Sequence, residues 1–148
     1  MLVAVAAIAA SGCGGGGSST QSLNDYTQSV VTARDRADFA LARITKAKSK
    51  EEFINRMDEA SAAIDEAASD LDGAGPAEGF EEETDKLVSA LQQLSVDLDA
   101  LAHDLRQPEG EGLLIGAQGL NFESWDKANL ALASLIGQGI EVELIGRH

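Results

Sequence analysis

The sequence predicts an all-α protein, an up-down-up-down antiparallel four-helix bundle preceded by a signal segment and a flexible linker. Hydrophobic residues make up 44% of the 148 residues but aromatic residues only 4%, so the core is built from Ala, Leu, Ile and Val. Ala and Leu are the strongest helix formers, whereas a sheet needs more β-branched and aromatic residues. Four stretches also carry apolar residues at spacings of three and four. Their short connections make neighbouring helices antiparallel.

The chain begins with a run that is typical of a secretory signal. Leu2–Ala10 is entirely apolar, too short for the ~20 residues that span a bilayer but suited to the core of a signal peptide. It leads into Ala10-Ser11-Gly12-Cys13, which resembles the bacterial lipobox. That resemblance implies cleavage before Cys13, the single cysteine, and lipid on its thiol. The alternative is an incidental cysteine after a frayed apolar end.

Two features of this segment depart from the usual pattern. Ala10 stands where the lipobox commonly has Leu, and no Lys or Arg precedes the apolar run. We therefore expect the signal peptide, residues 1–12, to be truncated at its start. The lipidated Cys13 and a Gly/Ser linker follow over 13–21, with a reach of roughly 15–18 Å. The bundle domain is expected over 22–148, held by lipid at the outer, extracytoplasmic face of the cell membrane.

The first two helices show clear start signals. Ser22 with Asp25 caps the first helix, whose apolar stripe comprises Leu23, Tyr26, Val30, Ala33, Ala37, Ala40, Ile44 and Ala47. Ser49 and Glu52 form a capping box for the second helix. Its stripe comprises Phe53, Met57, Ala60, Ile64, Ala67 and Leu71, and Gly73 and Gly75 end it.

The third and fourth helices are bounded by prolines and glycines. Pro76 suits the first turn of the third helix and Pro108 marks its end. A heptad seam lies between them: Phe80, Thr84, Leu87, Leu91, Leu94, Leu98, Leu101 and Leu105. The fourth stripe comprises Leu114, Ala117, Asn121, Trp125, Ala128, Leu132 and Leu135. Its glycine-rich first half (residues 110–119) is either a looser segment or a site of close helix approach. After Gly137 and Gly139 we expect a short extended segment over 140–144.

The charge distribution argues against nucleic-acid binding. The net charge is −14, and such an acidic surface repels phosphate. Residues 21–50 carry six basic and three acidic residues, whereas 51–148 carry five basic and 22 acidic ones. The favoured interpretation is a basic first helix lying against acidic neighbours. The other is an acidic remainder that attracts cations or a basic partner.

We find no constellation that specifies a reaction. A di-iron bundle needs Glu-x-x-His motifs, but Ala100 stands three residues before His103. Asp99 and His103 share a helix face and are weak metal candidates, although their place beside the heptad seam favours a solvent-exposed histidine. His148 is expected to be disordered. Catalytic residues and cofactors are therefore assigned as none.

The order of lipobox, Gly/Ser tether and Ala/Leu-rich helices resembles the small, uncharacterised lipoproteins of actinobacteria. The resemblance covers Leu2–Thr20 and, more loosely, Ala128–Gly139; it implies location and fold and transfers no site residue. The expected function is a non-enzymatic interaction or binding module, with the membrane as partner through Cys13, an unknown protein partner and no nucleic acid. The alternative is a small-ligand or cation-binding lipoprotein with a pocket between helices near the glycine-rich start of the fourth helix.

Overall fold

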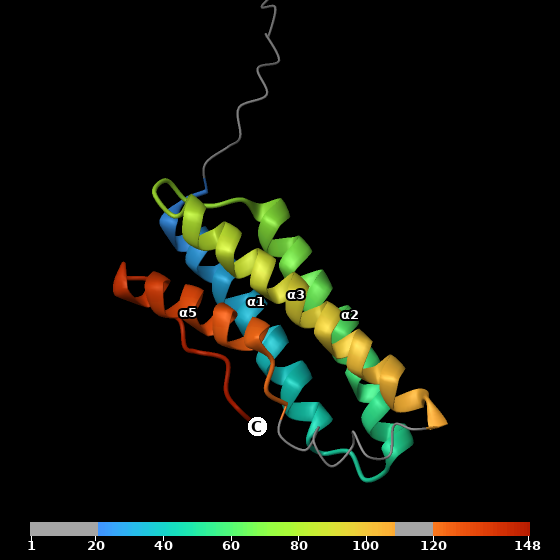
Figure 1. The fold of residues 1–148 in the computed structure, drawn as a ribbon. Coiled ribbons are helices and arrows are strands. Elements are labelled where there is room, and N and C mark those ends of the chain that lie inside the picture. The colour runs from blue at the N-terminus through green and yellow to red at the C-terminus, as the bar shows by residue number, and fades with distance from the viewer. Residues whose placement is uncertain (1–20, 109–119) are drawn as a thin grey trace, which may run out of the picture.

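The computed structural model describes residues 21–108 and 120–148, and every regular element within them is a helix. The helices are α1 (Leu23–Ile44), α2 (Lys50–Ala74), α3 (Glu81–Arg106) and α5 (Glu123–Gly137), packed side by side (Figure 1). This confirms the all-α class and is compatible with a helical bundle. The expected signal, Cys13, all of the linker but residue 21, and the glycine-rich segment 110–119 lie outside the described residues. None of these four helices has the length and apolar character needed to cross a membrane.

The first two helices begin where their caps predict. The Ser22 hydroxyl accepts a hydrogen bond from the Asp25 backbone N–H, and Ser49 does the same for Glu52. The Glu52 carboxylate in turn accepts from the N–H of Lys48, at 2.7 Å, so the return bond of the capping box reaches one residue before the cap. Helix α1 stops at Ile44, earlier than the expected Ala47.

The expected start of the third helix at Pro76 is wrong, because α3 begins at Glu81. Gly75 and Gly79 both have positive φ, at 77° and 88°, which interrupts helical geometry on either side of the proline. Ala77 in this connection is only 3% exposed. The connection therefore belongs to the core instead of continuing the helix.

The fourth helix is also shorter in its described part than its apolar period suggested. Residues 120–122 are not helical, and α5 runs from Glu123 to Gly137. Beyond it, residues 140–148 form no regular element, and the N–H of Val142 donates to the carbonyl of Ile140 at 3.1 Å. The glycine stop at Gly137–Gly139 is confirmed, with Gly139 at φ 95°.

The core consists mainly of the aliphatic residues that the periodicity selected. In α3 the seam residues Leu87, Leu91, Leu94, Leu98 and Leu105 are fully or almost fully buried. Phe80 and Leu101 are only partly buried at its edge. Trp125, a member of the fourth stripe, is 3% exposed, whereas Phe39, which does not belong to the stripe of the first helix, is 66% exposed.

The helices pack in chain order, α1 on α2, α2 on α3 and α3 on α5. Side-chain contacts join later residues of one helix to early residues of the next, as in Arg43–Glu59 and Asp97–Ser124. Asp58, early in α2, pairs with Arg106, the last residue of α3. Early residues likewise meet late ones: Arg36–Asp70 and Glu83–Ser134. The ion pairs of Arg36 and Arg43 place basic residues of α1 against acidic residues of α2, the favoured interpretation of the charge distribution.

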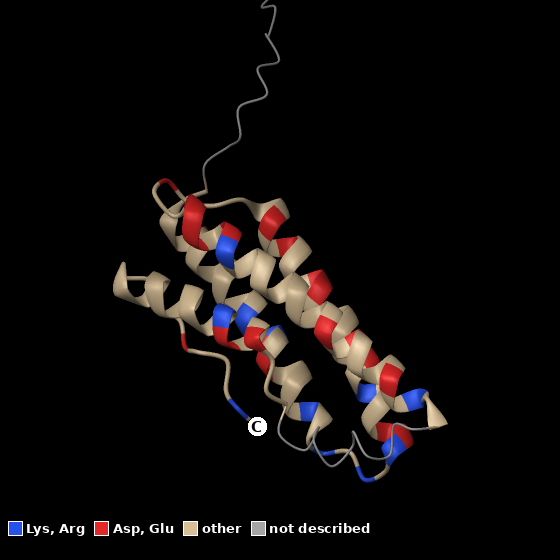
Figure 2. Ribbon diagram, viewed as in Figure 1, with Lys and Arg blue, Asp and Glu red and all other residues tan. Residues whose placement is uncertain are grey.

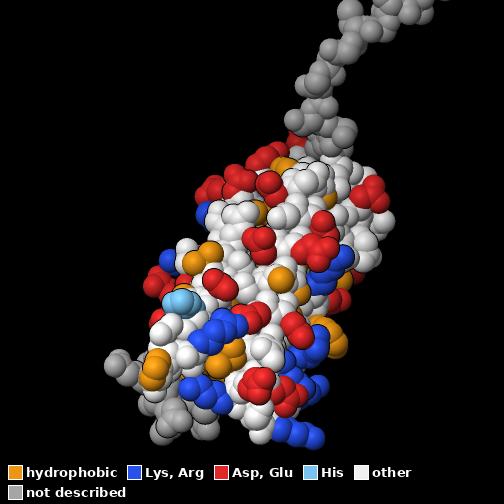
Figure 3. All heavy atoms as spheres, turned by 90° about the vertical axis from the view of Figure 1, so that its right-hand side faces the viewer, with side chains coloured by type: hydrophobic (Ala, Val, Ile, Leu, Met, Phe, Trp, Pro, Cys, Tyr) orange, Lys and Arg blue, Asp and Glu red, His pale blue; other side chains and the backbone are white. Residues whose placement is uncertain are grey.

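Charge is distributed unevenly over the helices. Figure 2 shows Asp and Glu along α2 and α3, with Lys and Arg on α1 and around the turn into α2. On the face shown in Figure 3, acidic and basic side chains are interspersed and hydrophobic ones form separate spots. Exposed ion pairs of this kind contribute about 0–1 kcal/mol each, so they orient neighbouring helices more than they stabilise them.

Candidate functional site

An open groove runs between α3 and α5. It encloses about 720 Å³. Its lining, hereafter the α3–α5 groove, consists of Glu82, Asp85, Lys86, Ser89, Ala90 and Gln93 from α3 and Lys127, Leu130, Ala131 and Ser134 from α5. The groove is one of two candidate sites on the described surface.

Small side chains explain why the α3–α5 groove is hollow. Ala90 and Ala131 are buried where the two helices meet, and Ser89 and Ser134 are too short to fill the space above them. Leu130 projects from α5 and is 70% exposed, which is unusual for a leucine beside a hollow. A bulky apolar side chain next to a small-residue floor is an arrangement suited to contact with another molecule.

Lysines on both walls of the groove are held by acidic neighbours one turn away. Lys86 Nζ lies 2.6 Å from Glu82 Oε1 and Lys127 Nζ lies 2.9 Å from Glu123 Oε1. The hydrogen bond to Glu82, more than the charge of that group, raises the pKa of Lys86, and the same bond lowers the pKa of Glu82. Both groups are therefore charged at neutral pH. The groove thus has an apolar floor of small side chains and a charged rim, whose lysines are paired with glutamates of their own helices.

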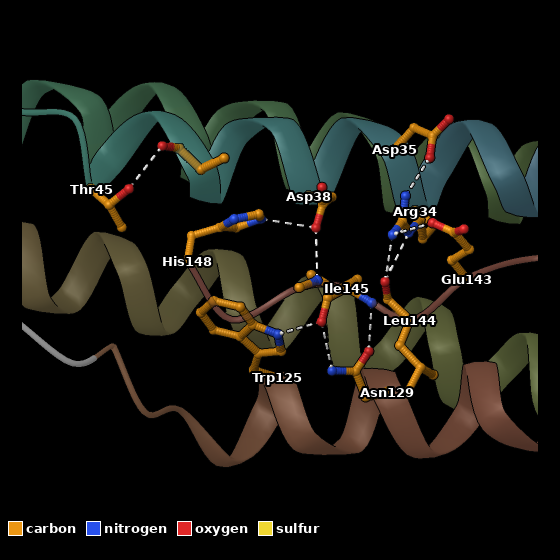
Figure 4. Close-up of polar contacts among 12 residues, drawn as sticks. Arg34, Asp35, Asp38, Thr45, Trp125, Asn129, Glu143, Leu144, Ile145 and His148 are labelled. Atoms are coloured by element: carbon orange, nitrogen blue, oxygen red, sulfur yellow. Dashed lines mark hydrogen bonds and ion pairs between the residues drawn. The ribbon is translucent and has the colours of Figure 1, made fainter.

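The second candidate site lies between α1 and α5 (Figure 4). Residues 138–148, hereafter the C-terminal segment, turn back along α5 and lie between that helix and α1. Ile140 and Ile145 are each 2% exposed. Polar side chains from both helices bind the backbone around Ile145. We call this arrangement the α1–α5 cleft.

Each wall of the α1–α5 cleft supplies specific hydrogen bonds. Asn129 Nδ2 donates to the Ile145 carbonyl at 3.0 Å, and Asn129 Oδ1 accepts from the Ile145 N–H at 2.8 Å. From α1, Arg34 donates to the Leu144 carbonyl through Nε at 3.0 Å and Nη2 at 2.6 Å. Asp38 Oδ1 accepts from the Gly146 N–H at 2.7 Å. Three successive backbone units are thereby fixed to two helices.

The electrostatics of the α1–α5 cleft favour an ionised Asp38. Burial acts to raise its pKa, but the hydrogen bond from Gly146 and the contacts with His148 and Arg34 outweigh burial. The pKa of Asp38 therefore lies below its ordinary value of 3.8. Asp38 carries a full negative charge at neutral pH and holds the C-terminal segment through it.

The metal candidates proposed from sequence lie on the exposed surface of α3. Asp99 and His103 are both exposed on α3, which agrees with a solvent-facing histidine. No group of three or more His, Cys, Asp or Glu side chains gathers within residues 21–108 and 120–148. The expectation that His148 is disordered is wrong: His148 Nε2 lies 3.0 Å from Asp38 Oδ1.

The residues of the α1–α5 cleft were missed at the level of sequence. Arg34 and Asp38 are separated from their partners by about 110 positions, so helical periodicity gives no sign of the contact. One signal was present: apolar and acidic residues alternate over 140–144, the pattern from which a short extended segment was expected. The α3–α5 groove, in turn, lies farther along the last helix than the pocket expected near its glycine-rich start.

Comparison with known proteins adds no relative, since the chain matches no protein family, no curated protein and no solved structure. The functional proposal therefore depends on the residues of the chain itself.

Proposed function

We propose that this chain is a membrane-anchored extracytoplasmic lipoprotein that acts as a non-enzymatic interaction module. In this proposal residues 1–12 are a cleaved signal peptide, Cys13 carries lipid, and residues 13–21 tether the domain to the outer face of the cell membrane. Residues 22–148 form an up-down-up-down four-helix bundle. Support for that topology comes from the side-chain contacts between successive helices, and support for the anchor comes from the sequence around Cys13.

One observation carries the interaction role: the α3–α5 groove with Leu130 exposed on its wall. Interaction surfaces characteristically combine an apolar centre with a polar rim. Here Ala90 and Ala131 give the centre, and Lys86 and Lys127 give cations on opposite walls. The groove suits a protein segment that packs an apolar side chain against Leu130 and pairs polar side chains with a rim on which Glu82 and Asp85 lie beside the two lysines.

Site-specific cross-linking tests this role. A photoreactive amino acid at Ser89, exposed on the α3 wall, is expected to cross-link one protein on intact cells. Leu130→Ser should abolish that product, because it removes the apolar contact. Val96→Ser is the matched control, since Val96 is 58% exposed on α3 but lies outside the groove. Equal products from both variants would contradict an interaction surface at the groove.

A second function, binding of a small ligand or cation, is favoured by one specific observation. The volume of about 720 Å³ lies within the range of small-molecule sites. A thermal-shift screen with metals and metabolites separates the two functions, because a ligand that binds only the folded state raises the melting temperature. A rise that Leu130→Ser removes would favour ligand binding over the protein partner.

A further inference from the structure

The α1–α5 cleft recognises the backbone of the segment that fills it. Arg34, Asp38 and Asn129 bond the carbonyl of Leu144, the N–H of Gly146 and both backbone groups of Ile145. These bonds use no side chain of the C-terminal segment. Any extended peptide that presents the same backbone N–H and carbonyl groups at the same positions can form these hydrogen bonds.

Side chains of the segment add further contacts: Arg147 bonds Asn121 and pairs with Asp126, and His148 Nε2 lies 3.0 Å from Asp38 Oδ1. Packing in addition restricts positions 145 and 146. Ile145 is 2% exposed and fills the apolar part of the cleft beside Trp125, whose Nε1 lies 3.5 Å from the Ile145 carbonyl. A Cβ at Gly146 would lie 3.2 Å from Asp38 Oδ1 and 3.2 Å from the His148 ring, which is closer than almost all ordinary contacts. The cleft therefore favours an apolar residue at position 145, and a side chain at position 146 would require Asp38 or His148 to shift.

We propose that the α1–α5 cleft also binds this segment in trans, so that two copies of the chain exchange residues 138–148 and form a dimer. The occupant is the C-terminal segment of a second copy, because the bonds and the Ile145–Gly146 fit made within one chain can be repeated between two. Each copy would then supply residues to its partner's cleft.

The connection between α5 and the segment permits such an exchange. A turn at Gly137–Gly139 joins them, Gly139 has φ 95°, and a Cβ added at either glycine would meet nothing within 4 Å. Opening this turn frees the segment without rearranging a helix. The closed and exchanged forms contain the same cleft contacts, so protein concentration determines the balance between them. This inference does not depend on the lipid anchor or on the α3–α5 groove.

Complementation between two full-length variants, both carrying Cys13→Ser, tests the exchange. The first carries Ile145→Asp and keeps an intact cleft; the second carries Asn129→Ala with Trp125→Phe and keeps an intact segment. Because the protein has one tryptophan, emission in the mixture reports only on the first variant's cleft. We expect mixing to give a species of twice the monomer mass and to return that emission towards the value of the Cys13→Ser protein. A mixture that stays monomeric with unchanged emission overturns the proposal.

A chain that carries Ile145→Asp together with Asn129→Ala and Trp125→Phe is the matched control, because both its segment and its cleft are disrupted and it should not pair with the first variant. A second measurement uses a labelled synthetic peptide of residues 138–148, so that the proposal can fail even if a variant is poorly folded. The peptide should bind the Ile145→Asp protein at least tenfold more tightly than the Cys13→Ser protein, whose own segment competes. It should bind the Cys13→Ser protein measurably at high concentration. A peptide that binds neither protein, or binds equally well with its own Ile145→Asp change, contradicts recognition in trans.

Discussion

Replacing Asn129 with Ala should destabilise the protein by removing both bonds to the Ile145 backbone. The two bonds, at 3.0 and 2.8 Å, are worth about 1 kcal/mol each net, and leaving the Ile145 N–H unpaired adds to the cost, whereas the Ile145 carbonyl keeps its contact with Trp125 Nε1. We expect a loss of about 2–3 kcal/mol, reduced by up to about 0.7 kcal/mol because Ala is the better helix former. For a domain of this size, roughly 4 °C per kcal/mol gives a fall in melting temperature of about 5–12 °C.

Thermal unfolding followed by far-UV circular dichroism and by Trp125 fluorescence measures this loss. Asn55→Ala is the control: Asn55 is exposed within α2, so its replacement has the same effect on helix propensity without removing a cleft contact. The difference between the two variants isolates the cleft bonds. If Asn129→Ala unfolds at the same temperature as Asn55→Ala, the C-terminal segment is not held as described.

Three further predictions follow from the core and the titrating groups. Leu98→Ala, at a fully buried position, should lower the free energy of unfolding, measured in urea, by about 3 kcal/mol. The control Val96→Ala, at an exposed position, should change it by less than about 0.5 kcal/mol. Similar losses in the two variants would contradict the burial of the α3 seam. Burial raises the pKa of Tyr26 above its ordinary value of 10.0 despite the opposing hydrogen bond to Thr84. The ultraviolet titration of Tyr26 should therefore lie above that of free tyrosine, and the stability of the protein should fall as pH rises through 10. Titration of Tyr26 at the free value would contradict its burial. The pKa of Asp38 is lowered, so its stabilising contribution is present above about pH 4 and is lost as pH falls through the folded-state pKa. Asp38→Asn should therefore lose less stability in acid than the wild-type protein does. An unchanged dependence of stability on pH would contradict the contacts of Asp38 in the cleft.

Local sequence signals predicted those features of the helices that depend on side chains close together in the sequence. The serine at position 49 and the glutamate at 52 define the start of α2, and the leucine heptads identify the buried side of α3. The start of α3 was misplaced because Pro76 is compatible with a helical first turn. The decisive residues are Gly75 and Gly79, whose positive φ values depend on how the connection packs over the core.

The candidate sites were harder to predict, because they arise from packing between distant residues. The α3–α5 groove exists because Ala90 meets Ala131 across two helices, a pairing that neither stripe specifies alone. The hydrogen bond between Asp38 and Gly146 likewise links residues 108 positions apart. The alternation of apolar and acidic residues over 140–144 predicted an extended segment, but it did not predict which helices bind that segment.

The central claim is that lipid on Cys13 anchors the domain, and metabolic labelling with a palmitate analogue in a bacterial host tests it most directly. The wild-type chain should incorporate the label and partition with membranes, because in this proposal a diacylglyceryl group is attached through the cysteine thiol. Cys13→Ala should lose both the label and the membrane fraction. Label that persists in Cys13→Ala would contradict the anchor.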